Sequence, residues 1–160
     1  MVESEGRPPR LLPPRALLIA LLVQVPALLL VWPPRPPGSW LVAGGLALLA
    51  GAALNLWADS AFKRGRVPVC PFKPVPALVE EGPYRYSRNP MYLGMVLICA
   101  SLALLTRTPV NLLAAAAYWV WLRQRFVIPE EAFLREQVGE RFQGYADRIP
   151  RWIGWPAARA

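Results

Sequence analysis

The chain has 160 residues, of which 55% are hydrophobic, and it carries a formal net charge of +8. This length accommodates one compact unit, so we expect a single domain over residues 1–160. The hydrophobic share exceeds what a soluble domain of this size needs. The Lys and Arg residues fall in clusters between apolar runs, and no basic-aromatic module is visible, which argues against a nucleic-acid partner.

The scarcity of metal-binding and nucleophilic side chains excludes several kinds of site. The sequence contains no histidine and only two cysteines, Cys70 and Cys99. Without histidine, neither a Ser-His-Asp nor a Cys-His catalytic arrangement can form. Two cysteines are too few for a zinc site of the usual composition or for a disulfide framework. We therefore expect no metal site.

Four runs without charged residues predict transmembrane helices. The first three cover residues 16–34, 36–58 and 89–106, each close to the roughly 20 residues that a membrane span needs. The fourth run, residues 108–122, is shorter, and the apolar residues 126–128 can extend it if the intervening arginines reach the membrane surface. The first run lacks a small-x-small cleavage pattern, so we interpret it as a span and not as a signal peptide.

The basic residues predict the orientation of these spans. Of the 18 Lys and Arg residues, all but Arg35 and Arg107 lie before the first span, between the second and third, or after the fourth. By the positive-inside rule, the tail 1–14, the loop 59–88 and the C-terminal segment 129–160 are cytoplasmic, as are both termini. The sequence thus predicts an all-α, polytopic integral membrane protein with about four transmembrane helices and a C-terminal cytoplasmic helix.

Small and polar residues in the second run predict how it packs. Ala43, Ala47 and Gly51 recur at every fourth position, which is typical of a close helix–helix contact. Asn55 and Asp59 share a helix face at positions i and i+4. Two interpretations of this pair stay open: a hydrogen bond between helices, or part of a cytoplasmic site.

The first of two polar segments covers residues 80–94, EEGPYRYSRNPMYLG. Gly82-Pro83 is a turn signal, and Asn89 is placed to cap a helix that begins at Pro90. A helix start surrounded by arginine and tyrosine attracts an anionic group. A basic anchor at the membrane surface is the alternative interpretation of the same segment.

The second polar segment follows the fourth run and extends from Pro129 to Arg151. Pro129 is expected to kink or restart the helix, which places Glu130 and Glu131 in a first helical turn, where carboxylates are favourable. The two carboxylates could serve only that turn. Alternatively, one of them could face inward and accept hydrogen bonds from hydroxyl groups of a ligand.

Together the two segments resemble the isoprenylcysteine carboxyl methyltransferase family of integral membrane methyltransferases, which is related to the phospholipid methyltransferases. The resemblance covers about residues 55–152. Its signatures are residues 82–94 and then Glu130, Glu131, Leu134, Gly139, Tyr145, Pro150 and Arg151. Many members have His where this chain has Asn89, although the Arg-Asn-Pro form is similar to a bacterial variant. The resemblance implies an enzyme of the bacterial inner (plasma) membrane.

The family resemblance also implies S-adenosylmethionine as cofactor and a lipophilic small molecule or lipid, entering from the bilayer, as methyl acceptor. The carboxylate of the cofactor suits Arg85 or Arg88, its ribose hydroxyls suit Glu130 or Glu131, and its sulfonium suits tyrosine. The expected cofactor-binding residues are Tyr84, Arg85, Tyr86, Arg88, Asn89, Pro90, Tyr92, Leu93, Glu130, Glu131 and Tyr145. The expected catalytic residues are Arg88, Tyr92, Glu130 and Arg151.

The expected reaction is an in-line methyl transfer in which proximity and orientation supply most of the catalysis. A carboxylate or thiolate acceptor requires no general base, whereas an amine acceptor could lose its proton to Glu130, Asp59 or water. Arg151 could neutralise an acceptor carboxylate or a phosphate. Three alternatives stay open: a phosphatidylethanolamine N-methyltransferase, a membrane oxidoreductase of the sterol reductase type, and a non-catalytic membrane scaffold.

Overall fold

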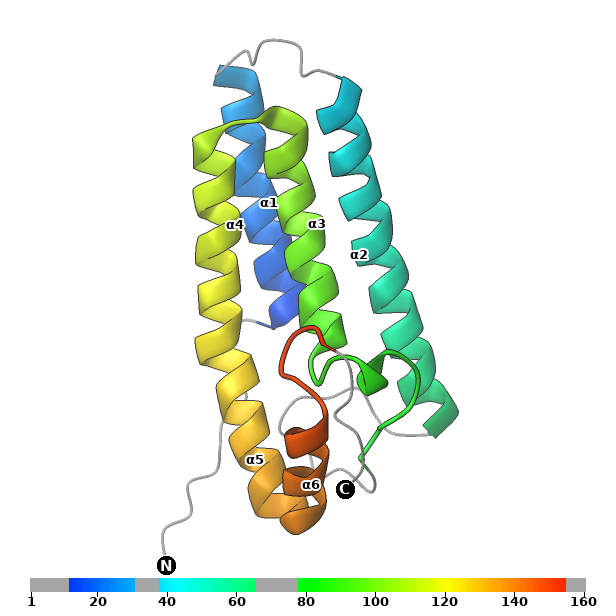
Figure 1. Cartoon of the computed structure of the whole chain (residues 1–160). Coiled ribbons are helices and arrows are strands. Elements are labelled where there is room, and N and C mark those ends of the chain that lie inside the picture. The colour runs from blue at the N-terminus through cyan, green and yellow to red at the C-terminus, as the bar shows by residue number, and fades with distance from the viewer. Residues whose placement is uncertain (1–11, 31–37, 66–77, 155–160) are drawn as a thin grey trace, which may run out of the picture.

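A computed structural model describes residues 12–30, 38–65 and 78–154 of the chain. Four long helices lie side by side, each antiparallel to the next along the chain (Figure 1). They are α1 (Pro13–Leu30), α2 (Gly38–Gly65), α3 (Pro90–Thr106) and α4 (Pro109–Leu122). Helix α3 packs against the other three, and α1 also packs against α4. The described residues are helical with short connections, so the all-α prediction is confirmed for them.

The described helices differ in their ability to cross a membrane. Helix α2 is the one that is long and apolar enough to span by itself, whereas α3 and Pro13–Pro26 of α1 are apolar but shorter. The 17 residues of α3 rise about 26 Å, less than the hydrocarbon core of about 30 Å. The topology with four spans therefore stays a prediction. Most of the predicted tail 1–14 and the middle of the predicted loop 59–88 lie outside the described residues.

Helix α2 continues beyond the span predicted for it. That span was expected to end at residue 58, but the helix ends at Gly65. The additional residues are mixed in polarity and stay helical: Lys63 forms an ion pair with Asp59 one turn earlier, and Ala61 packs in a small apolar cluster with Tyr84. The first part of the predicted cytoplasmic loop is therefore an extension of the helix.

The contact between α2 and α3 is built on glycine. Gly44 and Gly51 of α2 are buried, and a Cβ atom at Gly51 would stand 2.7 Å from the carbonyl oxygen of Gly94 in α3. The prediction that Ala43 belongs to this contact is wrong, because Ala43 is exposed. The buried glycines are seven residues apart, as expected for helices that stay in contact over two turns. Asn55 donates a 2.9 Å hydrogen bond to the Gly51 carbonyl of its own helix.

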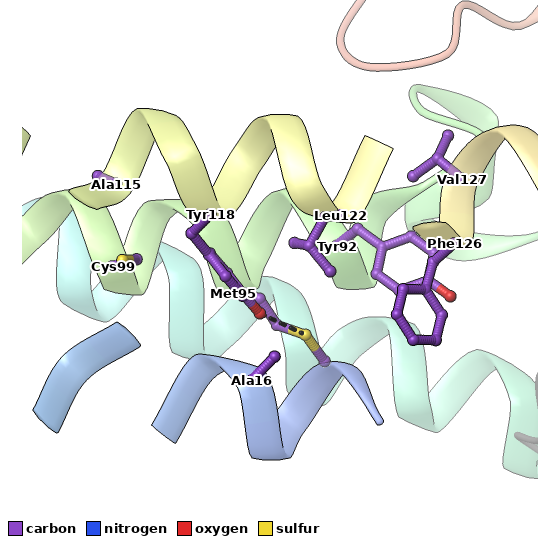
Figure 2. Packing of buried hydrophobic residues seen from close by; sticks show 9 residues of the cluster. All are labelled: Ala16, Tyr92, Met95, Cys99, Ala115, Tyr118, Leu122, Phe126 and Val127. Atoms are coloured by element: carbon purple, nitrogen blue, oxygen red, sulfur yellow. Dashed lines mark hydrogen bonds between the residues drawn. The ribbon is translucent and has the colours of Figure 1, made fainter. Parts of the chain in front are cut away.

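An aromatic core lies between α1, α3 and α4 (Figure 2). The Tyr118 hydroxyl of α4 donates to the carbonyl of Pro13 at 3.1 Å and lies 3.7 Å from the sulfur of Met95. Farther along the bundle, the rings of Tyr92 and Phe126 have centroids 6.2 Å apart. These two residues mark the end of the apolar core that meets the polar part of the molecule.

Helix α4 continues without a break through a π-helical turn, Arg123–Val127, into α5 (Ile128–Val138). The predicted restart of the helix at Pro129 is wrong, because the chain is helical on both sides of it and Val127 and Ile128 keep right-handed helical angles. Proline removes a backbone donor, and the wider turn before it accommodates the changed hydrogen bonding. Helix α6 (Glu140–Arg148) follows after Gly139, whose φ of +52° is a left-handed value that favours glycine.

Candidate functional site

The polar segments meet at one end of the bundle. There the 3-10 turn η1 (Gly82–Arg85), the start of α3, helix α5 and the segment after α6 lie close together (Figure 1). Backbone hydrogen bonds join the segment after α6 to the residues between η1 and α3. The N–H of Arg88 donates to the carbonyl of Pro150 at 3.0 Å, and the N–H of Gly154 donates to the carbonyl of Tyr86 at 3.2 Å. Residues that are far apart in the sequence thus form one structural unit.

Glu131 is the centre of a buried network of charges. Its residue is 2% exposed, and its two oxygens accept hydrogen bonds from Arg151 at 3.0 and 2.8 Å. The Nε atom of Arg88 lies 3.4 Å from Oε1 of Glu131, and Nδ2 of Asn89 donates to that oxygen at 3.3 Å. Arg135, which is half-exposed, approaches the other oxygen to 4.0 Å. Several guanidinium groups share one carboxylate, so this network carries excess positive charge.

The network keeps Glu131 ionised. Burial by itself raises the pKa of a carboxyl, but the hydrogen bonds from Arg151 and the charge of Arg88 outweigh burial and lower the pKa of Glu131. The same hydrogen bonds raise the pKa of Arg151. The Glu131 carboxylate and the Arg151 guanidinium are therefore both charged at neutral pH.

Glu130 has a different partner and a different charge preference. One of its oxygens accepts a 2.7 Å hydrogen bond from the hydroxyl of Tyr92 on α3. Burial raises the pKa of Glu130, and the charge of Glu131 acts in the same direction, while the hydrogen bond from Tyr92 opposes them. Consecutive residues of a helix point about 100° apart. This angle explains why one glutamate faces the arginines and the next faces the tyrosine.

Asn89 lies directly before α3, and Pro90 occupies the first turn of that helix, as predicted. The predicted cap is wrong, because the Asn89 side chain makes no capping hydrogen bond. Its amide instead donates to Glu131 and, at 3.2 Å, to the backbone carbonyl of Arg151. A helix start offers N–H donors to the oxygen of such an amide, whereas the buried carboxylate accepts a charge-assisted hydrogen bond from its nitrogen, and this stronger bond favours the observed orientation.

Two buried tyrosines attach α6 to η1. The hydroxyl of Tyr145 in α6 donates to the backbone carbonyl of Tyr84 at 2.7 Å. Tyr84 packs edge-on against Phe62 of α2, with ring centroids 5.3 Å apart. Burial raises the pKa of both tyrosines. Their hydroxyls are therefore protonated at neutral pH. The observed contacts show that these two tyrosines connect α6 with η1.

The structure brings some of the predicted site residues together and separates others. The assembled residues are Arg88, Asn89, Tyr92, Glu130, Glu131 and Arg151. Arg85 and the side chain of Tyr86 are exposed, and Leu93 is half-buried on α3. Of the two arginines considered for an anionic ligand, Arg88 lies in the network and Arg85 lies on the surface.

Sequence reasoning missed Ser87 and the backbone of the C-terminal segment. The Oγ atom of Ser87 accepts a 3.1 Å hydrogen bond from the N–H of Asn89 and lies 3.4 Å from the carbonyl of Arg151. Arg88 donates from Nη1 to the carbonyl of Ala146 at 2.8 Å. The position of Ser87 inside the first signature was a usable signal. Backbone carbonyls leave no such signal, because every residue carries one.

Comparison with known proteins identifies the family. A family model described as phospholipid methyltransferase matches residues 39–141, which is more than half of the chain. This range includes the Arg88-Asn89-Pro90 sequence and both glutamates, whereas Arg151 lies beyond it. Neither a curated protein nor a solved structure matches the chain. The resemblance found from the motifs is thus confirmed at the level of the family, and the chain belongs to the phospholipid methyltransferases, a family of membrane-associated methyltransferases.

Proposed function

We propose that the protein is an integral membrane methyltransferase that uses S-adenosylmethionine and acts on a lipophilic acceptor. The observation that carries this proposal is the contact between the two signature segments at one end of an apolar bundle. Asn89 meets Glu131 at 3.3 Å, and Tyr92 meets Glu130 at 2.7 Å. The family match supports methyl transfer to a lipid.

The arginine network fits the carboxylate of the cofactor's amino-acid portion. Arg88 and Arg151 share the single charge of Glu131, so the network can accept a second anion. When bound, S-adenosylmethionine supplies an activated methyl group on a cationic sulfur.

Glu130 is the better of the two glutamates for contact with ribose hydroxyls. Both oxygens of Glu131 are held by the arginines, and the residue is almost completely buried. Glu130 is half-buried and uses one oxygen for the Tyr92 hydroxyl. Its raised pKa also suits it to hold a proton released from an amine acceptor. We therefore assign ligand contact to Glu130 and positioning of the arginines to Glu131.

We infer that the methyl acceptor is of the kind that isoprenylcysteine carboxyl methyltransferases use. In this chain, Arg151 neutralises the acceptor carboxylate that is methylated. The matched family description favours a second candidate, the amine headgroup of a phospholipid such as phosphatidylethanolamine. Incubation with a methyl-labelled cofactor separates the two. Label on a prenylcysteine acceptor supports the first candidate, and label on native lipids after chromatography supports the second.

Calorimetry of the purified protein with S-adenosylhomocysteine tests the cofactor site. We expect binding to wild type and a loss of binding for Arg88→Ala and Glu131→Ala. Glu130→Gln retains the size of the side chain and should weaken binding without unfolding the protein. The exposed residues Arg125 and Glu136 provide controls, and their alanine variants should bind as wild type does.

Two results of this experiment contradict the proposal. One is the absence of heat with wild-type protein that is shown to be folded, which is the result expected for a non-catalytic scaffold. The other is equal affinity for wild type, Arg88→Ala and Glu130→Gln, which would leave methyl transfer possible but remove the assigned site. A thermal melt of each variant establishes that a lost affinity does not reflect a lost fold.

A further inference from the structure

Helices α1 and α4 flank an open groove of about 300 Å³ on the outside of the bundle. Helix α1 lines it with Ile19, Ala20 and Val23, and helix α4 lines it with Ala114, Ala117 and Trp121. Half of its lining residues are alanines, whose short side chains leave this space open. The volume is at the lower end of what small-molecule sites provide.

The lining of this groove offers no polar group in need of a partner. Tyr118 also lines it, but its hydroxyl already donates to the carbonyl of Pro13 at 3.1 Å. The other lining side chains are aliphatic or are the indole of Trp121. A polar ligand would lose its hydration here without compensation, whereas a hydrocarbon chain would not. The chemistry of the lining therefore selects an apolar occupant.

The groove lies in the half of the bundle that is nearest to the polar site. Its α1 residues come from the beginning of that helix and its α4 residues from the end, and both of these helix ends face the site (Figure 1). Trp121 of the groove contacts Phe126, with ring centroids 5.3 Å apart. Phe126 in turn lies beside Tyr92 (Figure 2), whose hydroxyl binds Glu130. The groove thus ends close to the candidate site, and the packed side chains of Phe126 and Tyr92 lie between the two.

Exposed leucines on both sides of the groove indicate where its occupant comes from. Leu18 and Leu22 of α1 are each 58% exposed, and Leu113 of α4 is 69% exposed. In a membrane-associated protein, the surface that such residues form is covered by lipid chains. A hydrocarbon chain can therefore enter the groove sideways from the surrounding lipid, without passing the charged network.

We propose that this groove binds the hydrocarbon chain of the methyl acceptor and so places the acceptor's headgroup beside Glu130 and Tyr92. This inference rests on the proposed function, because that function supplies the acceptor. It goes further by giving the lipid tail a defined position between α1 and α4. The residues that line the groove then determine which hydrocarbon chains are accepted, while the polar network determines which headgroups are accepted.

Photolabelling tests the groove independently of catalysis. The full-length protein is placed in phosphatidylcholine nanodiscs that contain a small fraction of phosphatidylethanolamine with a diazirine in its acyl chain. After irradiation, labelled peptides are identified by mass spectrometry. Ala117→Phe fills the groove, and Ala116→Phe makes the same change at the next residue, which is exposed outside the groove.

We expect lipid adducts on the α1 and α4 segments that line the groove in wild type and Ala116→Phe. In Ala117→Phe these adducts should fall roughly ten-fold, because the added ring occupies the space. Equal labelling of the two variants would overturn the inference. Labels spread evenly over bilayer-facing leucines such as Leu46, or adducts to a second copy of the chain in place of lipid, would overturn it as well.

Kinetics then connect the groove to the acceptor. Ala117→Phe should raise the KM for a long-chain acceptor roughly ten-fold and leave the affinity for S-adenosylhomocysteine unchanged, while Ala116→Phe should change neither. An unchanged KM for Ala117→Phe would overturn the assignment to the acceptor. If wild type fails to bind S-adenosylhomocysteine, the proposed function fails, and the photolabelling result still decides whether the groove holds a lipid chain.

Discussion

The two adjacent glutamates are expected to respond in opposite directions to the same substitution. Glu131→Gln removes the charge that Arg88 and Arg151 share. Loss of one partner from a buried ion pair costs about 3–5 kcal/mol. The Arg151 side chain is 31% exposed, so water screens part of its charge, and glutamine retains part of the hydrogen bonding. We therefore expect the free energy of unfolding to fall by about 2–3 kcal/mol.

Glu130→Gln should not cause this loss. Burial raises the pKa of Glu130, which means that the folded protein disfavours its charged form. Glutamine is neutral, has a similar shape and still offers an oxygen to the Tyr92 hydroxyl. At pH 8 we expect an unfolding free energy equal to that of wild type or higher by about 1 kcal/mol.

The same two residues predict opposite pH dependences. For Glu131, the folded pKa is lowered, so its contribution to stability is present above the unfolded pKa of about 4.3 and is lost as the pH falls through the folded value. For Glu130, the folded pKa is raised, so stability declines as the pH rises from about 4.3 through that higher value. Glu130→Gln should remove this decline and leave the acid-side loss in place.

Unfolding in detergent micelles with an increasing mole fraction of dodecyl sulfate measures these effects through tryptophan fluorescence, at about pH 3 for the acid-side loss of Glu131 and at about pH 5 and pH 8 for the decline caused by Glu130. Glu136→Gln is the matched control, because Glu136 is exposed on the same helix; its effect should stay within about 0.5 kcal/mol. Equal losses for Glu130→Gln and Glu131→Gln would refute the division of roles. So would a loss for Glu131→Gln no larger than that of the control.

Two further predictions concern the helix contact and the tyrosine. Gly94→Ala places a Cβ atom 2.7 Å from the carbonyl oxygen of Gly51, so we expect a loss of about 1–3 kcal/mol in the dodecyl sulfate assay. Gly45→Ala meets nothing within 4 Å and should gain about 0.5–1 kcal/mol; equal effects would contradict the close contact. Tyr92→Phe removes the hydrogen bond that lowers the pKa of Glu130, so the acidic limb of the methyl-transfer pH profile should move to higher pH. An unchanged profile would show that Glu130 does not control that limb.

Hydropathy and proline positions predicted where helices lie better than where they end. Pro90 and Pro109 both begin helices, because proline has a suitable φ and needs no donor in the first turn. The end of α2 was missed because hydropathy records the loss of apolar residues, whereas backbone hydrogen bonds and the Asp59–Lys63 pair continue the helix to Gly65. Of the two buried glycines of α2, Gly51 was predicted at the contact and Gly44 was missed, since spacing alone does not show which side of a helix meets its neighbour.

The two signature segments were predicted to lie at the same face of the membrane. In the structure, Glu131 contacts both Arg88 and Arg151. The separate environments of Glu130 and Glu131 could not be predicted from the sequence. They depend on the rotational position of α5, and the π-helical turn at 123–127 changes that position by widening one turn. Pro129 was a local sign of an irregularity here, although the restart of the helix that was considered for it does not occur.

The order in which the chain is synthesised has a consequence for the arginine network. Arg151 follows Glu131 by 20 residues, so at roughly 5–20 residues per second a growing chain carries this glutamate for about 1–4 s before its main partner exists. The carbonyls of Ala146 and Pro150, which bind Arg88, also arrive in that interval. All four long helices precede them. The helices that position the network are therefore synthesised before its last members, and the network is completed only when the segment after α6 has been translated.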